Sequence, residues 1–444
     1  MSDCLVASQS FGHTTSMNNR PHRSRAIRLA WLTSLVVLIG GCEAPPSEHP
    51  PPINTLDNPA PTNAQLPNII AGGKGAPLIL SWIETQGENT HRLRYSTWSP
   101  KTHWSASETV ATGGDWFVNW ADFPAVYAVD SDRLAAHWLK RSGPDTYAYD
   151  VITRQRIDGV WRASRSPHLD GTQTEHGFVS FYSIGGQPAL AWLDGRHTGS
   201  SGGDHASHAD SSGSMALRTR TLSSTPTPLI EHSTLLDDRV CDCCQTAAVN
   251  TDSGAIIFYR DRSPDEVRDI AYVRYDYSSK TWSPPRALHR DNWVINGCPV
   301  NGPQAAAQGQ TIAVAWFTAT PTPRVQLAMS DDGGAQFDAP VLVSDANPLG
   351  RVSIGITPSG RVMVGWIETQ RDNAVLKTTL YTPQGHKIRT LDIATVSSTR
   401  RSGFPRLGVV DEHTALIVWT DWQGGTSHVR TATVALPPAQ DDTH

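Results

Sequence analysis

Four cysteines are the residues whose type and spacing most directly suggest chemistry. They are the run Cys241-Asp242-Cys243-Cys244 and Cys298. Thiolate sulfur is a soft ligand that selects copper(I) or zinc, and one of the histidines His176, His205 and His208 could complete a tetrahedral set. We therefore consider a copper or zinc centre here, although the spacing matches no standard zinc motif.

The same cysteines allow two other interpretations. Disulfides are the usual state of cysteines outside the cytoplasm. Bonding within Cys-x-Cys or Cys-Cys is sterically unfavourable, so we expect Cys298 to bond to one of the other three. The two remaining thiols would then form a redox-active pair. A disulfide framework, a metal site and a redox thiol pair are all open at this point.

The strands that must position these cysteines form a repeat. An apolar strand ending in an aromatic residue, usually with a polar residue two positions later, occurs seven times. The aromatic residues are Trp82, Trp138, Trp192, Tyr259, Trp316, Trp366 and Trp419. Successive aromatics are separated by 56, 54, 67, 57, 50 and 53 residues. Such a period indicates a repeat architecture.

Each copy lies between further apolar segments, such as the one from Phe123 before it and the one from Leu93 after it. Four short antiparallel strands in each unit of about 50 residues are typical of a β-propeller blade. We therefore predict an all-β propeller of six or seven four-stranded blades over residues 68–436, rather than a two-sheet sandwich. The last unit has only three strands, so we expect the segment Gln65–Ile70 to close the ring.

One turn carries a more specific motif. Ser330-Asp331-Asp332-Gly333-Gly334-Ala335-Gln336-Phe337 fits Ser-x-Asp-x-Gly-x-x-aromatic. We expect Asp332 to accept hydrogen bonds from backbone amides, Gly334 to adopt a positive φ, and Phe337 to pack between blades. This pattern is the Asp-box, or BNR repeat, and through it the chain resembles the sialidase (neuraminidase) superfamily. Asp-boxes are structural, so the resemblance implies the fold more than an activity.

The propeller order sorts the loops onto two faces. Because the Asp-box turn joins the third and fourth strands, the loops between blades and those joining second and third strands share the opposite face. We expect the functional site there. The residues expected on this face are Glu84, Asp194, Arg196, Asp261, Arg262, Glu368, Asp421, Trp116, Trp120, His176, the four cysteines, Trp293, Arg351 and Arg401.

The resemblance to exo-sialidases implies particular roles. In that family three arginines hold the substrate carboxylate, a tyrosine is the nucleophile, and an aspartate is the acid/base. The candidates are Asp194, Asp261 and Tyr259 for catalysis, and Arg196, Arg262, Arg351 and Arg401 for the carboxylate. The family's Phe/Tyr-Arg-Ile-Pro motif is absent, and Tyr259 has the position of the blade-packing Trp316.

Three functional hypotheses follow. The first is a glycan-directed enzyme or lectin, in which Trp116, Trp120 and Trp293 stack on sugar rings; inter-blade packing is the alternative role for these indoles. The second is a metal-binding or thiol-redox protein centred on the cysteines. The third is a protein-interaction scaffold, which fits any propeller.

The N-terminal segment predicts a lipid anchor. Basic residues Arg20–Arg28 precede the apolar stretch Leu29–Ile39, which is shorter than the roughly 20 residues that span a bilayer. The following Gly40-Gly41-Cys42 resembles a bacterial lipobox. We expect a signal peptide over residues 1–41, with Met17 as an alternative start, and lipidation of Cys42; a plain secretory signal is the alternative.

That interpretation implies a location and two flanking segments. By analogy with bacterial lipoproteins, Glu43 after the cysteine favours the outer membrane of the cell envelope, with the lipid as the membrane contact. Eight prolines over residues 43–67 predict an extended tether, here taken as 42–67, and residues 437–444 are expected to be disordered.

The composition excludes several classes of protein. The chain has 37 basic and 42 acidic residues, a net charge of -5, so we expect no nucleic-acid partner. Charged residues make up 18% of the chain, against about 25% in typical domains, while Gly and Pro number 35 and 31. This composition suits many short strands and turns and excludes a coiled coil or a multi-span membrane protein.

Overall fold

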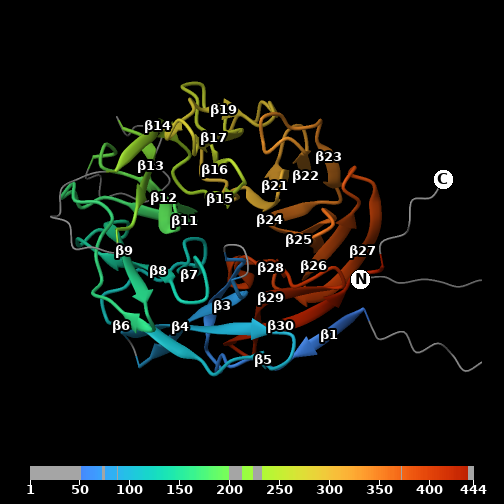
Figure 1. Ribbon diagram of the computed structural model, residues 1–444, viewed down its shortest axis with the longest axis horizontal. Coiled ribbons are helices and arrows are strands. Elements are labelled where there is room, and N and C mark those ends of the chain that lie inside the picture. The colour runs from blue at the N-terminus through green and yellow to red at the C-terminus, as the bar shows by residue number, and fades with distance from the viewer. Residues whose placement is uncertain are drawn as a thin grey trace, which may run out of the picture. The chain divides into compact units, whose positions relative to one another are not determined.

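Short apolar segments of the chain pair into antiparallel sheets that are arranged in a ring (Figure 1). The computed structural model describes residues 52–72, 76–87, 89–199, 213–223, 233–371 and 373–438, and these contain seven sheets. First strands of neighbouring sheets contact one another around a central channel. The prediction of an all-β propeller is confirmed, and the number of blades is seven.

Each blade runs from the channel outward in chain order. Blade 1 contains β2 (Gln65–Ile70), β3 (Ile79–Gln86), β4 (Thr90–Ser99), β5 (His103–Trp104) and β6 (Glu108–Gly113). Blade 2 contains β7 (Ala125–Ala128), β8 (Leu134–Arg141), β9 (Tyr149–Ile157) and β10 (Val160–Trp161). Blade 3 contains β11 (His176–Ile184), β12 (Gln187–Asp194), β13 (Met215–Thr221) and β14 (Thr234–Val240). Blade 4 contains β15 (Ala247–Asn250), β16 (Gly254–Arg260), β17 (Ile270–Asp276), β18 (Thr281–Trp282) and β19 (Arg286–Ala287).

The remaining blades follow the same order. Blade 5 contains β20 (Gln304–Gln308), β21 (Thr311–Thr318), β22 (Arg324–Ser330) and β23 (Val341–Ser344). Blade 6 contains β24 (Pro348–Ile356), β25 (Val362–Gln370), β26 (Asn373–Tyr381) and β27 (Lys387–Val396). Blade 7 contains β28 (Arg406–Val409), β29 (Thr414–Gln423), β30 (Thr426–Ala435) and β1 (Ile53–Leu56), and a 3₁₀ helix, Arg400–Ser402, precedes it.

The ring is closed by β1, which pairs antiparallel with β30 as the outermost strand of blade 7. The prediction that Gln65–Ile70 closes the ring is wrong, because that segment is β2, the first strand of blade 1. The strand β1 also lies inside the predicted tether 42–67, so the propeller begins before residue 68. An outermost strand buries little surface, so its sequence carries too few apolar residues to stand out among the prolines.

The repeated aromatic residues form the cores between blades. Trp82, Trp192 and Trp316 are fully buried in the second strands of their blades. In two of these three blades the indole N–H also explains the polar residue two positions later, which lies on the same side of the strand; the Trp316 indole donates to Asp291 instead. Nε1 of Trp82 donates to Glu84 at 3.0 Å, and that of Trp192 donates to Asp194 at 2.8 Å. The recurrent carboxylates are therefore partly structural.

The Asp-box turn has the local structure expected of the motif. The Asp332 carboxylate accepts hydrogen bonds from the backbone N–H groups of Ala335 and Gln336 at 2.8 and 3.1 Å. Gly334 has φ of +78°, and its missing Cβ leaves room for Ile256 of the neighbouring blade. Phe337 packs edge-on against aromatic rings of blade 4.

Several predictions concern residues outside the described ranges: the signal peptide, Cys42, His205, His208 and most of the C-terminal tail. Among the described residues, no helix has the length and hydropathy needed to cross a membrane.

Candidate functional site

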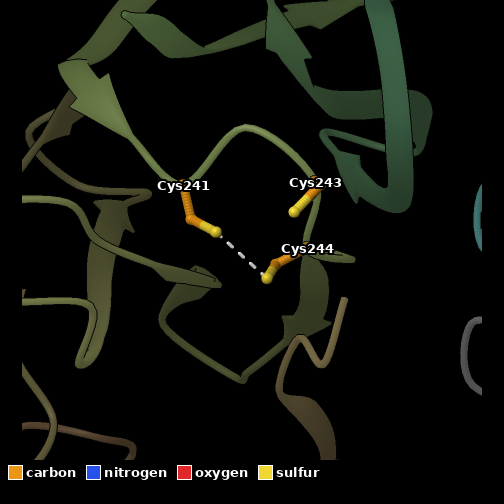
Figure 2. Close-up of side chains that lie close together, drawn as sticks. All are labelled: Cys241, Cys243 and Cys244. Carbon is orange, nitrogen blue, oxygen red and sulfur yellow. Dashed lines mark hydrogen bonds between the residues drawn. The ribbon is translucent and has the colours of Figure 1, made fainter. Parts of the chain in front are cut away.

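The cysteine run lies in the loop between blades 3 and 4, and Cys298 lies in the loop between blades 4 and 5. Cys243 forms a disulfide with Cys298. The other two thiols face one another, with 3.1 Å between the sulfurs of Cys241 and Cys244 (Figure 2). These two form a Cys-x-x-Cys pair, and both are buried in an apolar cluster.

The surroundings of this pair shift the pKa values of the two thiols in opposite directions. Burial alone would raise the pKa of Cys241, but the hydrogen bond from Cys244 and the positive charge of Arg268 outweigh it and lower that pKa. The Nη1 group of Arg268 lies 3.4 Å from the Cys241 sulfur. Burial and the neighbouring Cys241 raise the pKa of Cys244. A thiolate at Cys241 beside a neutral thiol at Cys244 is the pattern that favours dithiol chemistry.

Arg262 and Arg268, at the junction between blades 3 and 4, have their positive charges neutralised by carboxylates of the chain. Arg262 donates to Asp242 at 2.9 Å and to Glu266 at 2.8 Å. Arg268 donates to the same Glu266 at 2.7 Å. Both guanidinium groups are almost entirely buried, so their charges depend on these carboxylates.

The catalytic candidates Tyr259 and Asp261 do not form a nucleophilic pair. The Tyr259 hydroxyl donates to Asp237 at 2.5 Å, and burial, followed by the Asp237 charge, raises its pKa far above the usual value. This favours a role for Tyr259 as a blade-packing aromatic. Burial raises the pKa of Asp261 to about 6, and its carboxylate accepts from the Arg262 backbone N–H.

The four candidate arginines do not converge on one ligand. Arg196 pairs with Asp194 at 2.6 Å, and Arg262 pairs with Asp242 as described above. Arg351 donates to the Thr399 carbonyl at 2.9 Å and to Ser402, and Arg401 lies over the Trp422 ring at 4.8 Å. Arg196 and Arg262 are therefore paired with carboxylates of the chain itself, and a substrate clamp formed by the four arginines stays a prediction.

The three candidate tryptophans differ in their packing. Trp116 is buried against Trp138 at 5.5 Å between ring centroids, and Trp293 is buried beneath the Arg260 guanidinium at 4.9 Å. Trp120 is only half-buried. Its ring stacks on Phe404 at 5.6 Å and lies under Arg351 at 5.1 Å. Trp120 is thus the candidate with an accessible ring.

The central channel contains a residue that the sequence did not single out. The channel has a volume of about 960 Å³ and is lined by the first strands of the blades. Arg406, at the start of β28, lies on its wall with a side chain that is almost fully buried. Its guanidinium lies 4.4 Å from the Phe123 ring centroid and 5.7 Å from that of Phe404. An arginine in an otherwise apolar first strand, Arg406-Leu-Gly-Val409, is the signal that could have identified it.

Arg406 has no carboxylate to compensate its charge. Among the described residues its side chain has no hydrogen-bond or ion-pair partner, and its Nη1 atom is buried. Burial lowers the pKa of Arg406 to about 9. Arg351, also buried and without a carboxylate, has its pKa lowered to about 10 by burial and by the charge of Arg400.

Two acids with raised pKa values, Asp122 and Glu175, lie on either side of the Tyr149 hydroxyl. Asp122 lines the channel, and the Tyr149 hydroxyl lies 3.0 Å from an Asp122 oxygen and 2.7 Å from a Glu175 oxygen, so that it donates its one proton to one of the two carboxyl groups at a time. Burial raises the pKa of Asp122 to about 7 and that of Glu175 to about 8. Perturbed carboxyl groups of this kind cluster at functional sites.

His176 lies with carboxylates rather than completing the cysteine set. Its Nε2 atom is 3.2 Å from Asp170 and 3.8 Å from Asp194, and its ring stacks on His168 at 3.9 Å. The sulfur group with metal-ligand spacing contains Cys241, Cys243 and Cys244 without a histidine. The sequence missed Asp170 and His168, because their loop shows no periodicity or metal spacing.

No protein-family model matches the chain, and no curated protein sequence matches it. Solved structures show a low-identity likeness. A protein of unknown function from Dyadobacter fermentans is 12% identical, with a TM-score of 0.48 over 87% of this chain and 100% of that one. A PL25 ulvan lyase is 11% identical, with a TM-score of 0.49 over 84% of this chain and 95% of that one. The NanB sialidase of Streptococcus pneumoniae is 11% identical, with a TM-score of 0.41 over 86% and 94%.

Proposed function

We propose that the chain binds an acidic saccharide in its central channel, with the sugar's carboxylate or sulfate on Arg406. The observation that carries this proposal is the buried, uncompensated Arg406 guanidinium on the channel wall. A buried charge without a partner costs several kcal/mol. An anionic ligand bound to Arg406 would offset that cost. Its planar fork binds a carboxylate or sulfate through two parallel hydrogen bonds.

The size and lining of the channel suit a saccharide. Its volume of about 960 Å³ is at the upper end of small-molecule sites. Phe123, Tyr127 and Phe181 line it with aromatic rings, on which the apolar faces of sugar rings can stack. Gln245 and Asp122 also line the channel, where both already form hydrogen bonds within the chain.

An aromatic and cationic stack continues from the channel to the loop face. Arg406 lies over Phe404, Phe404 stacks on Trp120, and Trp120 lies under Arg351. A second buried cation, Arg351, and a half-exposed indole, Trp120, therefore extend the anion site outward. Such a site could hold more than one residue of an acidic oligosaccharide.

Binding of defined sugars by the full chain tests the proposal. Calorimetry would compare a glucuronate oligosaccharide and sialyllactose with neutral lactose, using wild type, Arg406→Met and the control Arg401→Met. We expect an acidic sugar to bind wild type and the control, and Arg406→Met to bind it about 10 to 100 times more weakly, as for a lost charged hydrogen bond. Equal affinities in wild type and Arg406→Met, or no discrimination against lactose, would contradict the proposal.

Catalysis is tested separately by release of reducing ends or unsaturated products from the bound sugar. Asp122, whose pKa is raised to about 7, is the group able to give or take a proton at neutral pH. Turnover that is lost in Asp122→Asn while binding persists would extend the proposal from a lectin to an enzyme.

A second candidate function is thiol–disulfide exchange at Cys241 and Cys244. The split in their pKa values favours it. The Cys241 thiolate would attack an external disulfide, form a mixed disulfide with one half of it and release the other half as a thiolate. Cys244 would then attack the Cys241 sulfur and displace the second half, so that two thiols are oxidised while one external disulfide is reduced. Equilibration with glutathione buffers, followed by thiol trapping, measures the couple; a pair that stays oxidised throughout would be a structural disulfide.

We also propose that lipid on Cys42 anchors the chain to the bacterial envelope, most simply at the outer membrane. The basic and apolar segments before Gly41-Cys42 support this. Incorporation of radiolabelled palmitate that is lost in Cys42→Ala would support the anchor, and unlabelled wild-type protein would contradict it.

A further inference from the structure

We propose that His176, Asp170 and Asp194 form a binding site for one divalent first-row transition-metal ion with nitrogen and oxygen ligands. His176 begins β11, and Asp194 ends β12 directly opposite it in the antiparallel register. Asp170 lies in the loop that leads into β11. The nearest ligand atoms of the three side chains lie within 4.8 Å of one another.

The tautomer of His176 carries the inference. Its Nδ1 atom lies 3.1 Å from the Thr174 carbonyl, an acceptor, so Nδ1 carries the proton and donates it. Without a metal ion, burial would lower the pKa of His176, but the charges of Asp170, Asp194 and Asp150 outweigh burial and raise that pKa. In the neutral ring the lone pair is on Nε2, which is fully buried and has no hydrogen-bond partner among the described residues. This lone pair faces two carboxylate oxygens, at 3.2 Å in Asp170 and 3.8 Å in Asp194. A positive ion between Nε2 and the two carboxylate oxygens removes the electrostatic repulsion between the lone pair and the carboxylates.

The spacing fits a metal ion. Bonds of about 2.1 Å place neighbouring ligand atoms about 3.0 to 3.4 Å apart in octahedral or tetrahedral coordination. The separations of 3.2 and 3.8 Å lie close to that range. A histidine whose Nδ1–H donates to a backbone carbonyl while Nε2 binds the ion is the usual arrangement at metal sites.

The surroundings hold the two carboxylates in place. Nδ1 of His168 lies 3.1 Å from Asp170, while Nε2 of the same ring accepts the Val151 backbone N–H, so His168 orients Asp170 rather than binding the ion itself. Asp170 also accepts the Thr172 backbone N–H at 3.0 Å. On Asp194, the Trp192 indole donates to Oδ2, while Nε of Arg196 donates to Oδ1, the oxygen that faces His176, so an ion would share Oδ1 with Arg196.

The charges balance when a divalent ion is present. Asp150, whose Oδ1 lies 3.6 Å from Nδ1 of His176, adds a third carboxylate to Asp170 and Asp194. With the Arg196 cation the group carries a charge of -2, so one divalent ion neutralises it while both histidines stay neutral. Imidazole and carboxylate ligands suit zinc, iron(II) and manganese(II), in contrast to the thiolates of the cysteine run.

The test is titration of the chelator-treated full chain with zinc and with cobalt(II). We expect one ion per chain, and a cobalt spectrum with weak d–d bands and without the strong thiolate charge-transfer bands. Binding should persist in the double variant Cys241→Ser/Cys244→Ser and in His289→Ala, which removes a comparable His–Asp pair in the loop between blades 4 and 5.

Substitutions in the site separate a metal site from a proton-bridged cluster. We expect His176→Ala and Asp170→Asn to abolish binding, and His168→Gln to weaken it about 10- to 100-fold, as outer ligand partners do. Asp170→Asn changes a loop residue, so it remains informative if His176→Ala does not fold. The proposal is overturned if folded wild type binds no ion, if the ion survives Asp170→Asn, or if His176 titrates as a charged imidazolium in the presence of zinc.

Discussion

Two regions of the propeller bury arginines in opposite ways. At the junction of blades 3 and 4, Arg262 and Arg268 share Glu266, and Arg262 also pairs with Asp242. On the channel wall, Arg406 has only aromatic rings beside it. The chain itself neutralises the first pair, which identifies those arginines as structural. Arg406 has no such partner among the described residues, which is the reason we propose it as an anion-binding residue.

The largest change in the free energy of unfolding should come from removing a carboxylate that neutralises Arg262 and Arg268. Asp242→Ala leaves the buried Arg262 and Arg268 with Glu266 alone, so we expect the free energy of unfolding to fall by about 3 kcal/mol. Denaturant titration measures the loss, with exposed Asp265→Ala as the control. A change as small as that of the control would mean that the junction does not depend on this ion pair.

The next effect concerns Glu175, whose pKa is raised first by burial and then by the charges of Asp122 and Asp242. Its folded pKa of about 8 lies above its ordinary value, so its contribution to stability is present below about pH 4.5 and is lost as the pH rises through 8. We expect the free energy of unfolding to fall by up to about 1.4 kcal/mol per pH unit in that window. Glu175→Gln should flatten this slope, whereas exposed Glu108→Gln should leave it unchanged.

Substitution of Arg406, whose charge has no partner among the described residues, should change the free energy of unfolding in the opposite direction. Arg406→Met replaces an unpaired buried charge with an apolar chain, so we expect the free energy of unfolding to stay constant or rise by about 1 kcal/mol. An acidic sugar at ten times its Kd should stabilise wild type by about 1.4 kcal/mol and leave Arg406→Met unchanged. If Arg406→Met were destabilised as much as Asp242→Ala, Arg406 would stabilise the fold like Arg262, and the contrast between the channel wall and the junction of blades 3 and 4 would be wrong.

The smallest effect should come from an arginine at the rim. Arg401 is exposed and lies over the half-buried Trp422 ring. Arg401→Ala should lower the free energy of unfolding by about 0.5 kcal/mol, as for an exposed cation–π contact. A loss of several kcal/mol would show that Arg401 stabilises the fold as strongly as Arg262 is expected to do.

The fold was largely predictable because its signal is local. Trp82, Trp192 and Trp316 recur at blade spacing, and each strand is apolar enough to be recognised alone. The ring closure was not predictable, because β1 is a four-residue outermost strand separated from its partner β30 by almost the whole chain. Pairing over that distance leaves little pattern in either segment.

The types of residue in the candidate site were predictable from the sequence, but which of these side chains contact one another was much less so. The face that holds the cysteines, Asp194 and Arg351 followed from strand order. Which groups meet depends on contacts between loops of different blades: Cys243 with Cys298, and Tyr149 with Asp122 and Glu175. No periodicity in the sequence encodes such contacts.

The sequence by itself determined a repeat of blades, the aromatic core between them and the face on which chemistry is concentrated, because strand alternation and turn chemistry act over a few residues. The tertiary structure alone decided which charges are neutralised. Arg262 pairs with Asp242, 20 residues away in the sequence, whereas Arg406 has no hydrogen-bond or ion-pair partner among the described residues. Charge compensation in a low-dielectric interior depends on separation in space rather than along the chain.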